Sequence, residues 1–354
     1  MNKGFANILS ADLDHVLHHS GDILEEFRDS LVFITGGTGF FGTWLLETFA
    51  WANIKLGLNV NAVILSRNPA NFQKKAPHLA NHDHFKFING DVRNFTFPEG
   101  KFHFVFHLAT EASDELNRND PLKMFDTIVE GTRHVLDFSV QAGVKKFLLT
   151  SSGAVYGKQP SGMTHISEDY TGSPDPLTPL SAYGEGKRTA ELLSSIYSQK
   201  HGIQVKIARC FAFVGPYLPL DKHFAIGNFI LDGIKNRAIL INGDGTPFRS
   251  YLYASDLVIW LITICLKGVD CVPYNVGAES AVSIAELATV VSDCFSIKPK
   301  VTIESESTAR DEIKRYVPST MKARIELGLK EEITLTDGII KTINFTIYQC
   351  ENSI

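Results

Sequence analysis

Short, mostly apolar runs recur along the first 150 residues of the chain, and each ends at polar residues or glycine. Their length and composition predict buried strands. The runs are Leu31–Ile34, Val60–Leu65, Phe85–Ile88, Phe104–Thr110 and Lys146–Thr150. The segments between them repeat apolar residues every three or four positions, most clearly in Met124–Ala142, and predict amphipathic helices. Strands that alternate with helices indicate an α/β fold with a doubly wound parallel sheet.

The first 30 residues precede the first predicted strand and carry a helical pattern of their own. Apolar residues stand at roughly helical spacing at Leu13, Val16, Leu17, Ile23, Leu24 and Phe27. We expect residues 1–30 to form an N-terminal helical extension packed on the edge of the sheet, with a partner-docking or dimer-swapping arm as the alternative. His15, His18 and His19 lack a nearby set of carboxylates or cysteines, so we expect no metal site there.

Composition and charge exclude several classes of protein. The chain has 354 residues, 44% of them hydrophobic, and a formal net charge of −5, which argues against nucleic acid or an anionic membrane as a partner. The five cysteines are odd in number and scattered, which disfavours a disulfide framework or a structural zinc site. The most apolar run, Leu257–Leu266, is too short to span a bilayer. We therefore expect a soluble, cytoplasmic protein without a metal.

A glycine turn, Thr35-Gly36-Gly37-Thr38-Gly39-Phe40-Phe41-Gly42, joins the first predicted strand to a helical segment. Gly36 permits a tight turn, Gly39 lets the backbone approach a pyrophosphate, and Gly42 lets the helix pack closely on the strand. Bare backbone amides at the start of a helix bind anions. The segment therefore predicts a dinucleotide-binding site, and the alternative is a plain glycine-rich βα turn.

The second predicted strand ends at Ser66-Arg67. NAD-selective folds place an acidic side chain here for the ribose hydroxyls, and this chain has none. A hydroxyl and a guanidinium instead suit the 2′-phosphate of NADP. NAD bound through backbone contacts, with Arg67 facing solvent, is the alternative. Asp91, followed by Val92, is a candidate for the adenine amino group, although Asn-Gly-Asp is also a common surface turn.

The fourth predicted strand ends with Leu108, Ala109 and Thr110. Ligands bind at the carboxyl ends of strands in open parallel sheets, so these residues are candidates for cofactor contact. Glu111 follows directly and is a possible acid or base; a solvated loop carboxylate is the alternative.

Tyr183 and Lys187 are four residues apart in a predicted helix over residues 181–201, so they share one face. A nearby ammonium lowers the pKa of a phenol, which is about 10 when unperturbed, so Tyr183 could exchange a proton with a sugar hydroxyl. Ser152, at the end of the preceding strand, could donate to the same substrate oxygen. A lone Tyr-x-x-x-Lys is often a solvated helix face, but the glycine turn and Ser152 favour the catalytic interpretation.

With these motifs the sequence resembles the extended short-chain dehydrogenase/reductase family, in its nucleotide-sugar epimerase, dehydratase and ketoreductase branch. The similarity runs from Leu31 to about Leu329. It is carried by the glycine turn, Gly90–Val92, His107–Ala109, Ser151–Gly157, Tyr183–Lys187 and Gly243–Tyr251.

The resemblance implies a Rossmann-type fold with a smaller C-terminal α/β substrate lobe. We expect residues 31–215 and 251–273 to form the NAD(P)-binding domain, and residues 216–250 and 274–345 to form the nucleotide-sugar lobe. By the same resemblance Ser152, Tyr183 and Lys187 form a catalytic triad, Arg249 and Arg310 clamp the diphosphate of the substrate, and two helices, from Met124 and from Tyr183, assemble a homodimer.

Two sets of binding residues follow. The expected cofactor-binding residues are Gly36, Thr38, Gly39, Phe40, Phe41, Gly42, Ser66, Arg67, Asp91, Val92, Leu108, Ala109, Thr110, Tyr183 and Lys187. The expected substrate-binding residues are Glu111, Ser152, Gly153, Ala154, His223, Asn228, Arg249 and Arg310.

Departures from the family pattern narrow the reaction. Gly153-Ala154 stands where 4,6-dehydratases carry an acidic pair and decarboxylases a glutamate, so both activities are disfavoured. Ala212 and Ile128 each replace a frequent asparagine, which leaves the identity of the sugar and the base open.

We expect an enzyme that moves a hydride at C4 of a nucleotide-linked hexose, either as a 4-epimerase or as a reductase of 4-keto-6-deoxy sugars. Ser66-Arg67 favours the NADP-dependent reductase. The alternatives are a 4,6-dehydratase or decarboxylase of the same family, and a non-catalytic NAD(P) sensor.

Overall fold

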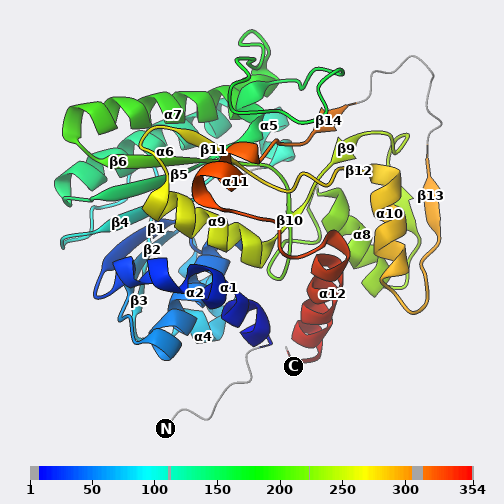
Figure 1. Ribbon diagram of the computed structural model, residues 1–354, viewed down its shortest axis with the longest axis horizontal. Coiled ribbons are helices and arrows are strands. Elements are labelled where there is room, and N and C mark those ends of the chain that lie inside the picture. The colour runs from blue at the N-terminus through cyan, green and yellow to red at the C-terminus, as the bar shows by residue number, and fades with distance from the viewer. Residues whose placement is uncertain (1–7, 111–112, 223, 305–313, 353–354) are drawn as a thin grey trace. The chain divides into compact units, whose positions relative to one another are not determined.

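The computed structural model describes residues 8–110, 113–222, 224–304 and 314–352. Within this part of the chain, contacts define two compact units (Figure 1). Unit 1 comprises Met1–Gly157, Gly172–Arg209 and Val258–Tyr274, and unit 2 comprises Lys158–Thr171, Cys210–Leu257 and Asn275–Ile354. The division differs from the predicted boundaries, since the N-terminal extension belongs to unit 1 while residues 158–171, 210–215 and 251–257 belong to unit 2.

Among the described residues, a seven-stranded sheet in the order β11-β6-β5-β4-β1-β2-β3 is the centre of the fold. β1 pairs in parallel with β2 and β4, β2 with β3, and β4 with β5. The strand order reverses between β1 and β4, which is where ligands bind in open α/β sheets. The strands are β1 Leu31–Thr35, β2 Asn61–Ser66, β3 Phe85–Asn89, β4 Phe104–His107, β5 Lys146–Ser152, β6 Gln204–Cys210 and β11 Pro273–Val276. The predicted Rossmann-type α/β fold is confirmed.

Helices follow most strands and bury apolar stripes against the sheet. α6, for example, buries Val135, Leu136 and Phe138, and Phe138 packs 4.5 Å from the ring of Phe33 on β1. The helices between β1 and β6 are α2 Phe40–Leu56, α3 Pro69–Lys75, α4 Pro77–Ala80, α5 Asp114–Asn119, α6 Pro121–Gln141, η2 Gly153–Tyr156, η3 Pro179–Ser181 and α7 Ala182–His201. α9 Ala254–Lys267 precedes β11.

Unit 2 has its own apolar core, to which Ile226 and Phe229 of α8, Ile239 of β8 and Leu287 of α10 contribute. A capping box at Ser283 starts α10. The elements of unit 2 are β7 Phe213–Val214, α8 Ala225–Ile234, β8 Ile239–Ile241, β9 Phe248–Arg249, β10 Leu252–Tyr253, β12 Val282–Ser283, α10 Ile284–Asp293, β13 Val301–Ile303, β14 Arg315–Tyr316, α11 Met321–Leu327 and α12 Leu335–Asn352.

The N-terminal extension consists of α1 Ser10–Leu24 and η1 Glu25–Phe27. Leu13 and Val16 are buried on α1, and Trp51 of α2 donates a hydrogen bond to Asp14 at 2.8 Å. The ring of Phe27 lies 4.5 Å from Phe104 of β4, an inner strand. The extension therefore covers a face of the sheet rather than its edge, contrary to the expected placement.

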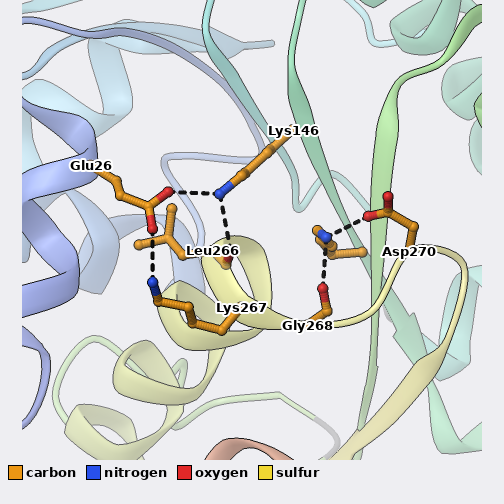
Figure 2. Close-up of polar contacts among 7 residues, drawn as sticks. Glu26, Lys146, Leu266, Lys267, Gly268 and Asp270 are labelled. Carbon is orange, nitrogen blue, oxygen red and sulfur yellow. Dashed lines mark hydrogen bonds and ion pairs between the residues drawn. The ribbon is translucent and has the colours of Figure 1, made fainter.

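An ion-pair network connects the extension to the rest of unit 1 (Figure 2). Glu26 of η1 accepts from Lys146 at the start of β5 (2.7 Å) and from Lys267 at the end of α9 (3.1 Å). Lys146 also donates to the carbonyl oxygen of Leu266 at 3.0 Å. On the neighbouring strand, the buried Lys206 pairs with Asp270. Lysines of β5 and β6 thus hold the turn that connects α9 to β11.

Replacing Glu26 by Gln should lower the free energy of unfolding by about 1 kcal/mol, a figure already reduced for solvent screening because Glu26 is 37% exposed. The reason is that Lys146, itself largely buried, loses its ion pair. Urea unfolding measures the effect. Glu25→Gln is the control, because Glu25 pairs only with the exposed Arg28 three residues away among the described contacts, and should change the stability less. Equal effects of the two substitutions would contradict the role given to Glu26.

Among the described residues, no helix is both long and apolar enough to cross a membrane. No three His, Cys, Asp or Glu side chains in the same residues are grouped so that they could hold a metal ion.

Candidate functional site

The turn between β1 and α2 requires glycine at two positions, because a side chain at either would collide with neighbouring backbone atoms. Gly36 has φ +68°, and a Cβ there would lie 2.8 Å from the backbone nitrogen of Ala109. A Cβ on Gly42 would lie 2.2 Å from the Cα of Gly37, so α2 can approach the turn only at a glycine. Gly39 precedes α2 and its amide donates to the carbonyl of Gly36 at 3.0 Å. The start of α2 therefore presents backbone N–H groups, which suit a phosphate.

The end of β2 lies beside this turn. Ser66 is buried, and its Oγ lies 3.3 Å from the hydroxyl oxygen of Thr38 and accepts from the amide of Asn68 at 3.2 Å. Arg67 is exposed. The structure thus brings Thr38 and Ser66 of the predicted cofactor set into contact.

Asp91 is held by a residue that the sequence analysis did not identify. Arg93 donates to its carboxylate from Nε at 2.9 Å, from Nη2 at 3.1 Å and from the backbone at 3.0 Å. These bonds lower the pKa of Asp91, and the charge of Arg67 lowers it further. The carboxylate is therefore ionised at neutral pH and held by the guanidinium of Arg93. The sequence could have predicted this contact, because Arg93 stands only two residues after Asp91 in a turn.

A buried chain of side chains links the ends of β1 and β4. The hydroxyl oxygen of Thr35 accepts from the amide of Ala109 at 3.2 Å and lies 2.8 Å from Nδ1 of His107. Nε2 of His107 lies 3.1 Å from the hydroxyl of Thr132. Burial, and then the nearby charge of Lys187, lower the pKa of His107 to about 3, so the imidazole is neutral at pH 7. These contacts fix both strand ends where the sheet order reverses.

Lys187 is 4% exposed and lies on α7. Its ammonium donates to the hydroxyl of Thr110 and to the carbonyl oxygen of Thr150, both at 2.7 Å. A buried ammonium is stable only when its hydrogens find acceptors, so these bonds hold it at the carboxyl ends of β4 and β5. Lys187 and Thr110 are two predicted cofactor residues that the structure brings together.

Tyr183 lies one turn before Lys187 on α7 and is half-buried, and its amide donates to Asn117 of α5 at 3.1 Å. Ser152 is buried at the last position of β5, where its Oγ accepts from the amide of Ala154 at 3.2 Å and starts η2. The strand was expected to end at Thr150, and its two additional residues carry Ser152. A hydroxyl, a phenol and an ammonium thus come from β5 and α7.

α7 packs closely on η2 because Gly184 has no side chain. A Cβ there would lie 2.8 Å from the carbonyl oxygen of Ala154. On the other side of α7, Ile128 is a buried core residue of α6, and a Cβ on Gly186 would lie 3.1 Å from it. Ile128 therefore packs against α7, which accounts for the apolar side chain at this position.

Unit 2 holds two of the predicted substrate residues. Arg249 on β9 is half-buried, and its guanidinium donates to the carbonyl of Phe248 at 2.8 Å and lies 5.8 Å from the ring centre of Tyr316. Asn228 is exposed on α8. Glu111, His223 and Arg310 lie outside the described residues.

A family model described as "NAD dependent epimerase/dehydratase family" matches residues 32–277, well over half of the chain. The chain belongs to this family. The predicted resemblance to the extended short-chain dehydrogenases/reductases of nucleotide sugars is therefore confirmed, and the enzyme class is NAD-dependent modification of nucleotide sugars.

Several relatives of this epimerase/dehydratase chain carry the same name. UDP-glucuronic acid decarboxylase 6 of Arabidopsis thaliana is 32% identical over 87% of this chain and 86% of its own length. UDP-glucuronic acid decarboxylase 1 of the same plant is 31% identical over 88% of this chain and 69% of its own length. UDP-glucuronic acid decarboxylase 1 of Xenopus tropicalis is 30% identical over 91% of this chain and 73% of its own length.

Solved structures agree on the fold. UDP-glucose 4-epimerase from Thermotoga maritima, solved with UDP-glucose, has a TM-score of 0.76 at 21% identity and covers 90% of this chain and 99% of its own. The dTDP-glucose 4,6-dehydratase DesIV from Streptomyces venezuelae, solved with NAD bound, has a TM-score of 0.74 at 22% identity and covers 91% and 97%.

Proposed function

We propose that this epimerase/dehydratase family member oxidises the C4 hydroxyl of a nucleotide-linked sugar, and that its substrate is UDP-glucuronic acid, which it decarboxylates. The relatives at 31–32% identity over 87–88% of the chain carry this proposal, because they are named UDP-glucuronic acid decarboxylases. They favour decarboxylation over the C4 epimerisation or reduction expected from the sequence.

The residues of unit 1 suit the first step. Tyr183 takes the proton of the C4 hydroxyl, Lys187 stabilises the phenolate, and Ser152 donates a hydrogen bond to the same oxygen. A nicotinamide cofactor held by the glycine turn would accept the C4 hydride. The hydroxyl of Thr110 and the carbonyl of Thr150 keep the ammonium of Lys187 on the side of α7 that carries Tyr183.

The missing acidic residues at Gly153-Ala154 are compatible with decarboxylation. A ketone at C4 lies β to the carboxylate carried by C5, so the C5–C6 bond breaks with its electron pair moving to the C4 oxygen as CO₂ leaves. Tyr183, which holds the proton taken from the C4 hydroxyl, and the hydroxyl of Ser152 can donate hydrogen bonds to the resulting enolate oxygen. A proton from water then adds to C5, and return of the hydride to C4 and of the proton from Tyr183 to the C4 oxygen restores the hydroxyl. A 4,6-dehydratase must also remove the C5 proton and protonate the leaving C6 hydroxyl, for which Gly153 and Ala154 offer no group.

The absence of a carboxylate at Gly153-Ala154 also favours a second candidate, a 4-epimerase or 4-keto sugar reductase, since neither needs an additional acid or base. One assay separates the candidates. UDP-glucuronic acid labelled with ¹³C at C6 should release labelled CO₂ and leave a UDP-pentose. Retention of the label in a C4 epimer, or NADPH consumption with a 4-keto-6-deoxy nucleotide sugar, would support the second candidate. No product from any of these substrates would refute both.

We further propose that NADP is the cofactor, because Ser66 and Arg67 replace an acidic residue at the end of β2. Arg67→Ala should weaken NADP binding by about 10- to 100-fold through loss of a charge-assisted hydrogen bond, and should leave NAD binding nearly unchanged. Fluorescence titration of both cofactors measures this. Lys74→Ala removes an exposed cation of the next helix, α3, as the control. Equal weakening of NAD and NADP by Arg67→Ala would contradict the proposal.

A homodimer through α6 and α7 remains a proposal. Leu192 and Ile196 are one turn apart on α7 and are 61% and 47% exposed, and Leu122 of α6 is 69% exposed. Sedimentation velocity should give about twice the chain mass of 39.2 kDa. A monomer at micromolar concentration would contradict the proposal.

A further inference from the structure

A half-buried ion pair lies behind the end of β5. Glu191 of α7 and Arg209 of β6 are 13% and 15% exposed. Arg209 donates to the two carboxylate oxygens of Glu191, from Nε at 3.0 Å and from Nη2 at 2.7 Å. Ser151 donates from its hydroxyl to the same carboxylate at 2.5 Å. The guanidinium of Arg209 also lies 4.8 Å from the ring centre of the buried Tyr156.

These contacts enclose Ser152 along the chain. Ser151 directly precedes it on β5, and Tyr156 ends η2, the short helix that Ser152 starts. Successive side chains of a strand point to opposite faces, so the hydroxyl of Ser151 reaches Glu191 of α7 while that of Ser152 lies on the other side of the strand end, where it accepts from the amide of Ala154. The ion pair thus holds the chain on both sides of Ser152.

The same contacts fix the register of α7 on β5. Lys187 donates to the carbonyl of Thr150, and Glu191, one turn later, accepts from the hydroxyl of Ser151. Two successive residues of the strand are thereby fastened to two successive turns of the helix that carries Tyr183. A slip of α7 by one residue would break both bonds.

Because Glu191 and Arg209 are both charged and largely buried, each needs the other in place. Burying either charge alone is costly, and a bidentate arginine–carboxylate pair compensates with fixed geometry. Burial lowers the pKa of Arg209, but the hydrogen bond to Glu191 and the charges around it together outweigh burial and raise that pKa above its usual value. Arg209 is therefore charged at any pH at which the protein is folded.

We propose that Glu191 and Arg209 are positioning residues for hydride transfer: together they hold Ser152 at the end of β5 in register with Tyr183 and Lys187 on α7. The inference rests on the proposed function for its kinetic consequence. Neither residue touches the reacting atoms, so their loss should reduce kcat without weakening the binding of cofactor or sugar nucleotide.

Three variants test the inference: Glu191→Gln, Arg209→Met and the double variant. Each single variant should lower kcat by about 10- to 100-fold, as expected for misplaced catalytic groups, with KM and the Kd for the cofactor within about threefold of wild type. Each should also lower Tm, because one charge is left buried without its partner. The double variant removes both charges and should recover Tm but not kcat. Recovery of kcat together with Tm would overturn the inference, because the pair would then serve stability alone.

Hydrogen exchange gives a readout that needs no substrate. The backbone amides of residues 151–157 should exchange at least about tenfold faster in Glu191→Gln than in wild type, because their local opening becomes easier. Glu26→Gln is the matched control, since it removes a partner of Lys146 at the opposite end of β5 and should leave these amides and kcat unchanged. Unchanged exchange in Glu191→Gln would overturn the inference. If wild-type protein turned over no nucleotide sugar, the proposed function would fail, and the exchange rates would still decide whether the pair holds this segment.

Discussion

Tyr183→Phe should reduce turnover by about 10³-fold while NAD(P) binding stays within about twofold of wild type. The substitution removes only the hydroxyl that carries the proton. The ammonium of Lys187 keeps its hydrogen bonds to Thr110 and Thr150. Steady-state kinetics with the substrate found in the labelled-sugar assay, together with a cofactor titration, measure the two quantities.

Tyr197→Phe is the matched control because Tyr197 lies on the same helix. Its hydroxyl donates to Asp137 at 2.6 Å, and burial together with that carboxylate raises the pKa of Tyr197 to about 12. It cannot give up its proton near neutral pH, so its loss should change kcat by less than about threefold. Turnover by Tyr183→Phe at the wild-type rate would remove Tyr183 from the mechanism.

Gly36→Ala should abolish cofactor binding and lower the free energy of unfolding by about 2–5 kcal/mol. Gly36 has φ +68°, where an L-residue is strained, and its new Cβ would be 2.8 Å from backbone atoms of Leu108 and Ala109. Either α2 or the end of β4 must then move, and both border the predicted phosphate site. Urea unfolding and cofactor titration measure the two effects.

Gly57→Ala is the control that distinguishes backbone strain at positive φ from a steric clash of the new Cβ. Gly57 ends α2 with φ +61°, and a Cβ there would meet no heavy atom of the described chain within 4 Å. This variant should cost only the backbone strain, about 1 kcal/mol, and should bind cofactor normally. The interpretation of the glycine turn would be wrong if Gly36→Ala behaved like Gly57→Ala.

Much of the fold could be predicted because its signals are local. The glycine turn needs only eight consecutive residues, and the strands before and after it are short apolar runs. Strand ends were less accessible: β4 ends at His107, three residues before the expected Thr110, and β5 continues to Ser152. At these ends, contacts with other strands decide where the backbone leaves the sheet, and those partners are far away in the sequence.

The supporting residues of the site could not be found from one sequence for the same reason. Thr35 and His107 are 72 residues apart, and Glu26 and Lys146 are 120 apart. Arg209 meets Glu191 only because β6 lies beside β5 under α7. Arg93 beside Asp91 is the exception, since that contact spans two residues and was overlooked.

The reaction was the property hardest to predict from the sequence. In the sequence, the missing acidic residues at Gly153-Ala154 disfavoured a decarboxylase. The names of the relatives favour it, and loss of CO₂ from a β-keto acid needs an electron-accepting ketone rather than an additional carboxylate. The absent residue therefore argued more strongly against dehydration than against decarboxylation.

The central claim is that Tyr183, Lys187 and Ser152 support hydride removal from C4 of the sugar. The most direct test uses UDP-glucuronic acid carrying deuterium at C4, mixed with enzyme and unlabelled oxidised cofactor and quenched during the first turnover. The account predicts deuterium on the nicotinamide ring of the reduced cofactor, detected by mass spectrometry. Product formed while the cofactor never gains deuterium would contradict it.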